Sequence, residues 1–178
     1  MSNWKKIKKV LKYSLLSILS VIVILVIAFI IYLQMNKMKP AVAYSINSPS
    51  LEKKLLIATQ GSRFKDAVTG NIANSFKGKN VYVRVEDVAF LQNASITDWN
   101  AVIVLNSCEY NTLHKSVLKF TQQPNLSGKL LLLATSGPGT WKPKNFPADT
   151  ISSASKMKHV ETITQSVLNW LKNNLGEF

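Results

Sequence analysis

The sequence is poor in residue types that many functional sites require. It has one cysteine, Cys108, so an internal disulfide or a cysteine-rich metal site is excluded. Its two histidines, His114 and His159, are far apart in the chain and lack the spacing of metal ligands. Only two arginines occur, with no arginine-rich run, RNA-binding aromatic motif or zinc-finger spacing, so nucleic acid is not an expected partner. No Ser-His-Asp set or pair of carboxylates can be placed in one catalytic site, and Cys108 is expected to be structural.

Positive charge is abundant by comparison. The chain of 178 residues has a net charge of +13, and five lysines fall within the first twelve residues, where there is no acidic residue. From Met38 onward, 16 basic residues are present against 9 acidic ones. An excess of this size favours anionic ligands or lipid headgroups.

An uncharged segment, residues 13–36, follows the N-terminal lysines, and its centre, LLSILSVIVILVIAFIIYL, is almost wholly apolar. A helix of this length, at about 1.5 Å per residue, is long enough to cross a hydrocarbon core of about 30 Å. The sequence therefore predicts a transmembrane helix at 13–36, with the lipid bilayer as its partner. By the positive-inside rule, the basic residues 1–12 lie in the cytoplasm and the C-terminal domain lies outside it, at the cell membrane.

A cleaved signal peptide is the alternative to a membrane anchor, because AVAY (41–44) resembles a small-residue cleavage site. The apolar run is longer than the core of a signal peptide, and two lysines separate it from Ala41, so an uncleaved signal-anchor is favoured. Residues 37–50 include two prolines and have no periodicity, and they are expected to form a tether. A folded domain is predicted over 51–178.

Strand-like and helix-like patterns alternate within this domain. Continuous apolar runs are typical of strands buried on both faces, whereas VYVRV alternates as in a half-covered edge strand. The predicted strands are 54–59, 81–85, 101–107, 129–136 and, least clearly marked, 149–153. Apolar residues at helical spacing predict helices over 64–76, 113–120 and 160–171.

This alternation predicts parallel β-α-β units with right-handed crossovers. The expected fold is a three-layer α/β sandwich around a parallel sheet in the order 2-1-3-4-5. In such a sheet a ligand binds beyond the carboxyl ends of the strands, at the point between strands 1 and 3 where the order reverses. The loops that follow the strands at 54–59, 101–107 and 129–136 should therefore form one site.

The first of these loops, TQGSRFK (59–65), has the features of an anion site. Gly61 permits close backbone approach, Ser62 can cap the following helix, and the N-terminus of a helix favours an anion. Arg63 and Lys65 add positive charge. A capped helix with solvated basic side chains is the alternative.

The other two loops offer flat rings and hydrogen-bonding groups. In NSCEYNT (106–112), Tyr110 can stack on a planar ligand while Glu109 and Asn111 supply acceptor and donor groups; an ordinary turn before a helix is the alternative. The loop that follows the third of these strands is expected to expose backbone amides and one large aromatic ring to a ligand. The alternative is that this ring packs on its own domain. Its candidate contacts are Ser136, Gly137, Gly139 and Trp141.

The layout resembles flavodoxin-like proteins, and two segments resemble the NAD(P)H-dependent FMN reductase branch. GSRFK (61–65) is similar to the G-S-x-R phosphate loop of that branch, with the arginine one residue early. CEYNTLHKSVLK (108–119) resembles its P-E-Y-N…L-K segment, with Cys108 in place of the proline, and SGPG (136–139) corresponds loosely to its glycine-containing loop. The resemblance covers about residues 54 to 140.

This resemblance implies FMN bound with its phosphate at 61–65 and its ring near Tyr110 and the 136–141 loop. It also implies an NAD(P)H donor, a redox partner and a homodimer. The first functional hypothesis is therefore a membrane-anchored, FMN-dependent oxidoreductase or electron-transfer protein. The second is a non-catalytic flavodoxin-like module with a degenerate flavin site, acting as a binding or accessory protein of the cell envelope. The export of the domain favours the second hypothesis, and the E-Y-N segment favours the first.

Overall fold

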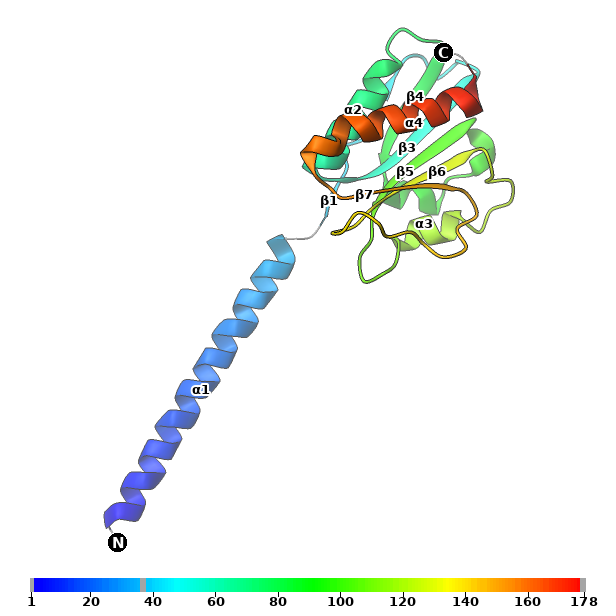
Figure 1. Ribbon diagram of the computed structural model, residues 1–178. Coiled ribbons are helices and arrows are strands. Elements are labelled where there is room, and N and C mark those ends of the chain that lie inside the picture. Colours follow the sequence, from blue (N-terminus) through cyan, green and yellow to red (C-terminus); the bar gives the residue numbers. More distant parts are fainter. Residues whose placement is uncertain (1, 36–37, 177–178) are drawn as a thin grey trace. The chain divides into compact units, whose positions relative to one another are not determined.

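The computed structural model describes residues 2–35 and 38–176. The chain divides into an N-terminal unit, residues 1–37, and an α/β unit that starts at Met38 (Figure 1).

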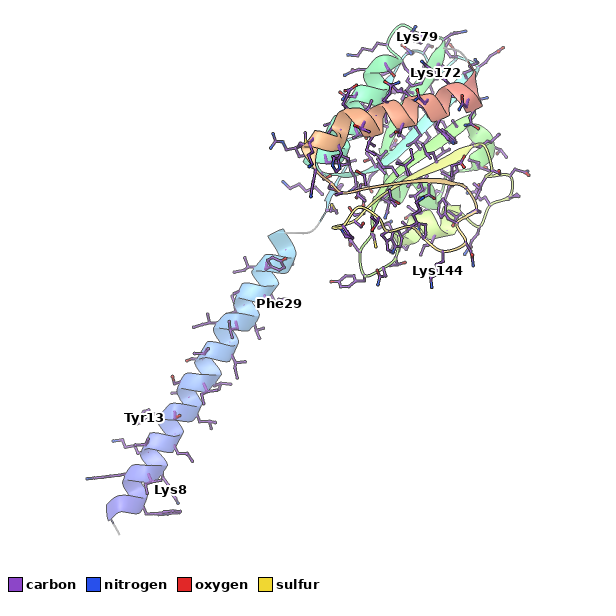
Figure 2. All side chains as sticks on the ribbon, in the orientation of Figure 1. Lys8, Tyr13, Phe29, Lys79, Lys144 and Lys172 are labelled. Atoms are coloured by element: carbon purple, nitrogen blue, oxygen red, sulfur yellow. The ribbon has the colours of Figure 1, made fainter. Side chains whose placement is uncertain are left out.

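The N-terminal unit is one uninterrupted helix, α1 (Ser2–Met35). Its stretch Lys6–Tyr32, 27 residues, is long and apolar enough to cross a membrane by length and composition. Figure 2 shows apolar side chains projecting from the helix on all sides, Phe29 among them, and the described ones are exposed to solvent. An apolar surface all around a helix is what a lipid-facing segment presents. The structure therefore supports a membrane-anchoring helix over most of the predicted 13–36; residue 36 lies outside the described residues.

The second unit contains a mostly parallel sheet of seven strands. The strands are β1 (Lys39–Pro40), β2 (Tyr44–Ile46), β3 (Lys53–Gly61), β4 (Val81–Asp87), β5 (Ala101–Ser107), β6 (Leu130–Thr135) and β7 (Asp149–Ser153). The strands β4, β3, β5, β6 and β7 lie side by side in that order and are all parallel. A strand is therefore present at each of the five segments predicted from the sequence, including the weakly marked 149–153.

The strand order of the whole sheet differs from the predicted 2-1-3-4-5. The sheet runs β2-β4-β3-β5-β6-β7, and β1 pairs with the carboxyl end of β3. Both additional strands are antiparallel and come from residues 37–50, which were expected to form only a tether. Because β2 occupies the outer side of β4, the edge of the sheet is β2 and not the 81–85 segment that was predicted to be an edge.

Helices cover both faces of the sheet. Figure 1 shows α2 (Arg63–Ser75) and α4 (Val160–Leu175) on one face and the short α3 (Lys115–Phe120) on the other. The turns η1 (Val88–Gln92) and η2 (Ile96–Asp98) connect β4 to β5 and pack on the α3 face. These three α-helices overlap the predicted helical segments 64–76, 113–120 and 160–171, although the second begins at Lys115.

Successive residues of the central strands feed two separate cores. In β3, Leu55 and Ile57 join the cluster under α2 and α4, whereas Leu56 and Ala58 join the cluster under α3 and η1. All four are fully buried. This is why the central strands are continuous apolar runs: neighbouring side chains point to opposite faces, and both faces are covered.

Candidate functional site

Buried polar side chains gather where the parallel strands end. The strands β3, β5, β6 and β7 each have, as their last or second-to-last residue, a polar residue that is at most 8% exposed. These residues are Gln60, Ser107, Thr135 and Ser153. Since carboxyl ends of parallel strands meet at one edge, the sheet brings a row of hydroxyl and amide groups together there.

The most unusual member of this edge is Lys65, in the first turn of α2. Its side chain is 0% exposed and points toward β5, where Nζ donates a hydrogen bond of 2.6 Å to Ser107 Oγ. No carboxylate among the described residues lies within ion-pair distance of this amine. Burial lowers the pKa of Lys65 from 10.5 to about 8, and the more distant charges of Glu109 and Asp66 offset part of that effect.

Ser107 is held from several sides. Its Oγ lies 3.2 Å from Thr135 Oγ1 on the neighbouring strand, and its backbone N–H donates to Gln60 Oε1 at 2.7 Å. The amide of Asn106, which is fully buried, donates to the Ser107 carbonyl and accepts from the backbone of His114 at 3.2 Å. Lys65, Ser107 and Thr135 therefore form a continuous, fixed row of one amine and two hydroxyls.

A segment of the predicted tether covers this row. Met38 Sδ lies 3.8 Å from Lys65 Nζ and 3.9 Å from Ser107 Oγ. The next two residues form β1 and pair with Gln60 and Gly61 at the end of β3. Farther along, the backbone N–H of Ala41 donates to Asp87 Oδ2 at 3.0 Å.

In the predicted anion loop the helix is capped as expected, but backbone of the same chain lies against the glycine. Ser62 caps α2 by accepting from the backbone N–H of Lys65 at 3.3 Å, and Arg63 is exposed. A Cβ on Gly61 would lie 2.8 Å from the Lys39 carbonyl oxygen. The close approach that this glycine allows is thus made by β1.

The loop after β5 is a tight turn that points into solvent. Glu109 and Thr112 form an isolated antiparallel bridge, and Tyr110 and Asn111 between them have φ values of 51° and 60°. Tyr110 is 93% exposed. At this exposure its ring is accessible to a ligand.

The loop after β6 folds back on its own domain. Ser136 Oγ accepts from the backbone N–H of Gly139 at 3.1 Å, and a Cβ on Gly139 would lie 2.4 Å from the Ala154 nitrogen. Trp141 packs against the cluster under α3, and its carbonyl accepts from Ser152 Oγ at 2.7 Å. Gly137 is exposed, and among the described residues other than its chain neighbours no atom lies within 4 Å of a Cβ built there.

Of the eleven residues predicted for the site, only Lys65 belongs to the buried row that it forms with Ser107 and Thr135. The sequence analysis missed its partners Ser107, Thr135 and Met38. One signal was present: Lys65 is four residues before Thr69 and seven before Ile72, both buried, so it belongs to the inward face of α2.

The remaining residues that can carry chemistry have local roles. His114 caps α3 by accepting from the backbone N–H of Ser116 at 3.3 Å, and His159 Nδ1 lies 3.4 Å from Ser153 Oγ. Cys108 is a partly buried free thiol. Within residues 2–35 and 38–176, no cluster of three or more His, Cys, Asp or Glu side chains is placed to hold a metal ion.

The described residues thus comprise an N-terminal apolar helix and an α/β domain whose sheet is mostly parallel. No protein-family model matches the chain, and no curated protein matches it significantly.

Proposed function

We propose that the chain is a membrane-anchored protein of the cell envelope whose flavodoxin-like domain acts as a binding or accessory module without a flavin. Two features support the flavodoxin-like assignment. The five parallel strands follow the spatial order β4-β3-β5-β6-β7, in which the order of strand addition reverses between β3 and β5, and helices lie on both faces.

The position of β1 is the observation that carries the proposal. In an α/β sheet of this kind, an anionic group binds against the glycine after the first strand and the N-terminus of the helix that follows it. Here the backbone of Lys39 and Pro40 lies against Gly61. A phosphate and β1 cannot occupy this place together, so a ligand that used it would have to displace part of the sheet.

Charge and helix length support the anchor and its orientation. The stretch Lys6–Tyr32 is of spanning length, and lysines are concentrated at its N-terminal end. This asymmetry favours a cytoplasmic N-terminus and an α/β domain on the other side of the membrane. A domain there would need a supply of flavin outside the cytoplasm, which also favours a module that works without one.

An FMN-dependent reductase, with NAD(P)H as donor and a homodimeric assembly, is the second candidate function. The exposure of Arg63 at the start of α2 and of Tyr110 at the tip of its turn supports it, because both are accessible to a phosphate-bearing ring. This function requires β1 to leave Gly61.

A titration of the full-length protein in detergent micelles with FMN distinguishes the two. We expect no quenching of flavin fluorescence and no shifted flavin absorption at micromolar protein. Saturable quenching that weakens in both Arg63→Ala and Tyr110→Ala would replace the proposal with the reductase hypothesis. Lys77→Ala, which changes another exposed basic residue, serves as the control for general loss of charge.

A further inference from the structure

We propose that Ser107 is a nucleophile activated by Lys65, and that the carboxyl edge of the sheet reacts with small carboxylic esters and related acyl compounds. This activity is separate from flavin binding and goes beyond the proposed function.

The donors and acceptors around Lys65 suit a neutral amine better than an ammonium ion. An ammonium ion has three protons to donate. Within the described residues Nζ has one close oxygen acceptor, Ser107 Oγ at 2.6 Å, and one distant sulfur. A neutral amine can instead accept the proton of Ser107, while Ser107 Oγ accepts from Thr135 Oγ1 at 3.2 Å. The hydrogen bonds then run from Thr135 to Ser107 and from Ser107 to Lys65, which is the direction of donation that a nucleophilic serine with a lysine base requires.

A structural role explains this lysine poorly. Lysine is rarely buried completely unless it is paired with a carboxylate, and Lys65 is 0% exposed without such a pair among the described residues. It also lies in the first turn of a helix, where the helix dipole disfavours a cation. Burial lowers the pKa of Lys65 to about 8, so roughly one molecule in ten holds the neutral amine at pH 7. Strongly shifted groups beside a potential nucleophile are characteristic of reactive sites.

The reaction with an ester proceeds in two balanced stages. Ser107 Oγ bonds to the carbonyl carbon while Lys65 Nζ takes the hydroxyl proton, and the alkoxide leaving group then departs with that proton. Water adds next to the acyl-serine, gives one proton to Lys65, and Ser107 Oγ leaves and recovers it. The net change is ester plus water to carboxylic acid plus alcohol, with Lys65 neutral at both ends.

Met38 controls access to the hydroxyl. Its sulfur lies 3.9 Å from Ser107 Oγ, and Ser107 itself is only 8% exposed. Met38 is 39% exposed and has an unbranched side chain, so a change of its rotamers can uncover Ser107 without movement of the sheet. The reactive compounds should therefore be small.

The test treats the full-length protein in detergent micelles with an alkyl fluorophosphonate and follows the mass of the peptide containing residue 107. In the labelling reaction the serine oxygen bonds to phosphorus, fluoride leaves, and Lys65 takes the proton. We expect an adduct on Ser107 in the wild-type protein and none in Ser107→Ala. Lys65→Met, which keeps an unbranched side chain but removes the amine that acts as the base, should slow labelling about 100-fold or more. Ser153→Ala is the matched control, since it removes another buried hydroxyl of the same edge, and it should label normally.

Two further measurements strengthen the test. Met38→Ala should label faster than the wild type, and the wild-type rate should rise with pH and level off above about pH 8, where Lys65 is neutral. Hydrolysis of p-nitrophenyl acetate, followed as released nitrophenolate, should show the same order among the variants. Absence of an adduct on Ser107 in both the wild type and Met38→Ala would overturn the proposal. Equal labelling rates in the wild type and a folded Lys65→Met would overturn it as well.

Discussion

Replacement of the buried Lys65 by methionine should make the α/β domain more stable at neutral pH. A fall of the lysine pKa from 10.5 to about 8 corresponds to about 3 kcal/mol, since a pKa difference of one is worth about 1.4 kcal/mol. The side chain is fully buried, so solvent screening does not reduce this figure. The substitution also removes the hydrogen bond to Ser107, which costs about 1 kcal/mol. The free energy of unfolding of Lys65→Met should therefore exceed that of the wild type by about 2 kcal/mol at pH 7, a gain of the kind found when apolar residues replace buried charges.

The sign of the pH dependence follows from the same shift. The unfolded chain keeps the lysine proton up to about pH 10.5, whereas the folded protein releases it near pH 8. Between these values the unfolded state binds more protons, so the stability of the wild type rises with pH. The cost of the buried charge is fully present below about pH 8, and the advantage of Lys65→Met should shrink as the pH is raised to 9.5.

Urea unfolding of the full-length protein in micelles, followed by tryptophan fluorescence, measures this difference, because Trp99 is 8% exposed in the folded domain. Lys77→Met is the control: it makes the same replacement at an exposed site, and its effect should stay within about 0.5 kcal/mol at both pH values. A Lys65→Met protein that is less stable than the wild type at pH 7, by an amount that does not change with pH, would refute the reasoning.

Three other predictions concern the loops and the anchor. Gly139→Ala should destabilise the domain by about 2–4 kcal/mol in urea unfolding, because φ is +79° and the new Cβ would lie 2.4 Å from the Ala154 nitrogen. Gly137→Ala, whose new Cβ would have no atom of the described residues within 4 Å apart from its chain neighbours, should change stability by less than about 0.5 kcal/mol. Asn47→Ala should cost about 2–3 kcal/mol, since the Asn47 amide donates to three backbone carbonyls and accepts from one backbone N–H, and a loss below about 0.5 kcal/mol would contradict this. A reporter enzyme fused after Phe178 should be active only outside the cytoplasm, and cytoplasmic activity would reverse the predicted orientation.

The sheet was predictable from sequence where its strands are buried on both faces. The runs 54–59, 101–107 and 129–136 are continuous and apolar because each supplies both cores, and this pattern is hard to mistake. The segment 149–153 gave a weak signal because four of its five residues are at least partly exposed. β1 and β2 gave no recognisable signal in the sequence, because they have only two and three residues, mostly exposed, and β1 contains a proline.

The site was harder to predict than the fold because its key contacts join distant parts of the chain. A glycine after a strand can accommodate either a ligand or protein backbone, and nothing local shows that Gly61 faces Lys39. The burial of Lys65 depends in the same way on Ser107, which is 42 residues away, and on Met38. A lysine at the start of a helix is ordinarily solvated, and only its helical register with buried neighbours indicated otherwise.

The position of residues 38–40 also separates the two chemistries considered for this edge. A phosphate against Gly61 requires the backbone of β1 to leave, which breaks its pairing with β3. In the proposed reaction of Ser107, by contrast, the group that must move is the Met38 side chain, whose sulfur lies 3.9 Å from the Ser107 hydroxyl oxygen. Met38→Ala should therefore speed the labelling of Ser107 without creating saturable FMN binding, because the substitution leaves the backbone of β1 against Gly61. FMN binding that appears only together with faster labelling in Met38→Ala would contradict this separation, because it would tie both chemistries to the same side chain.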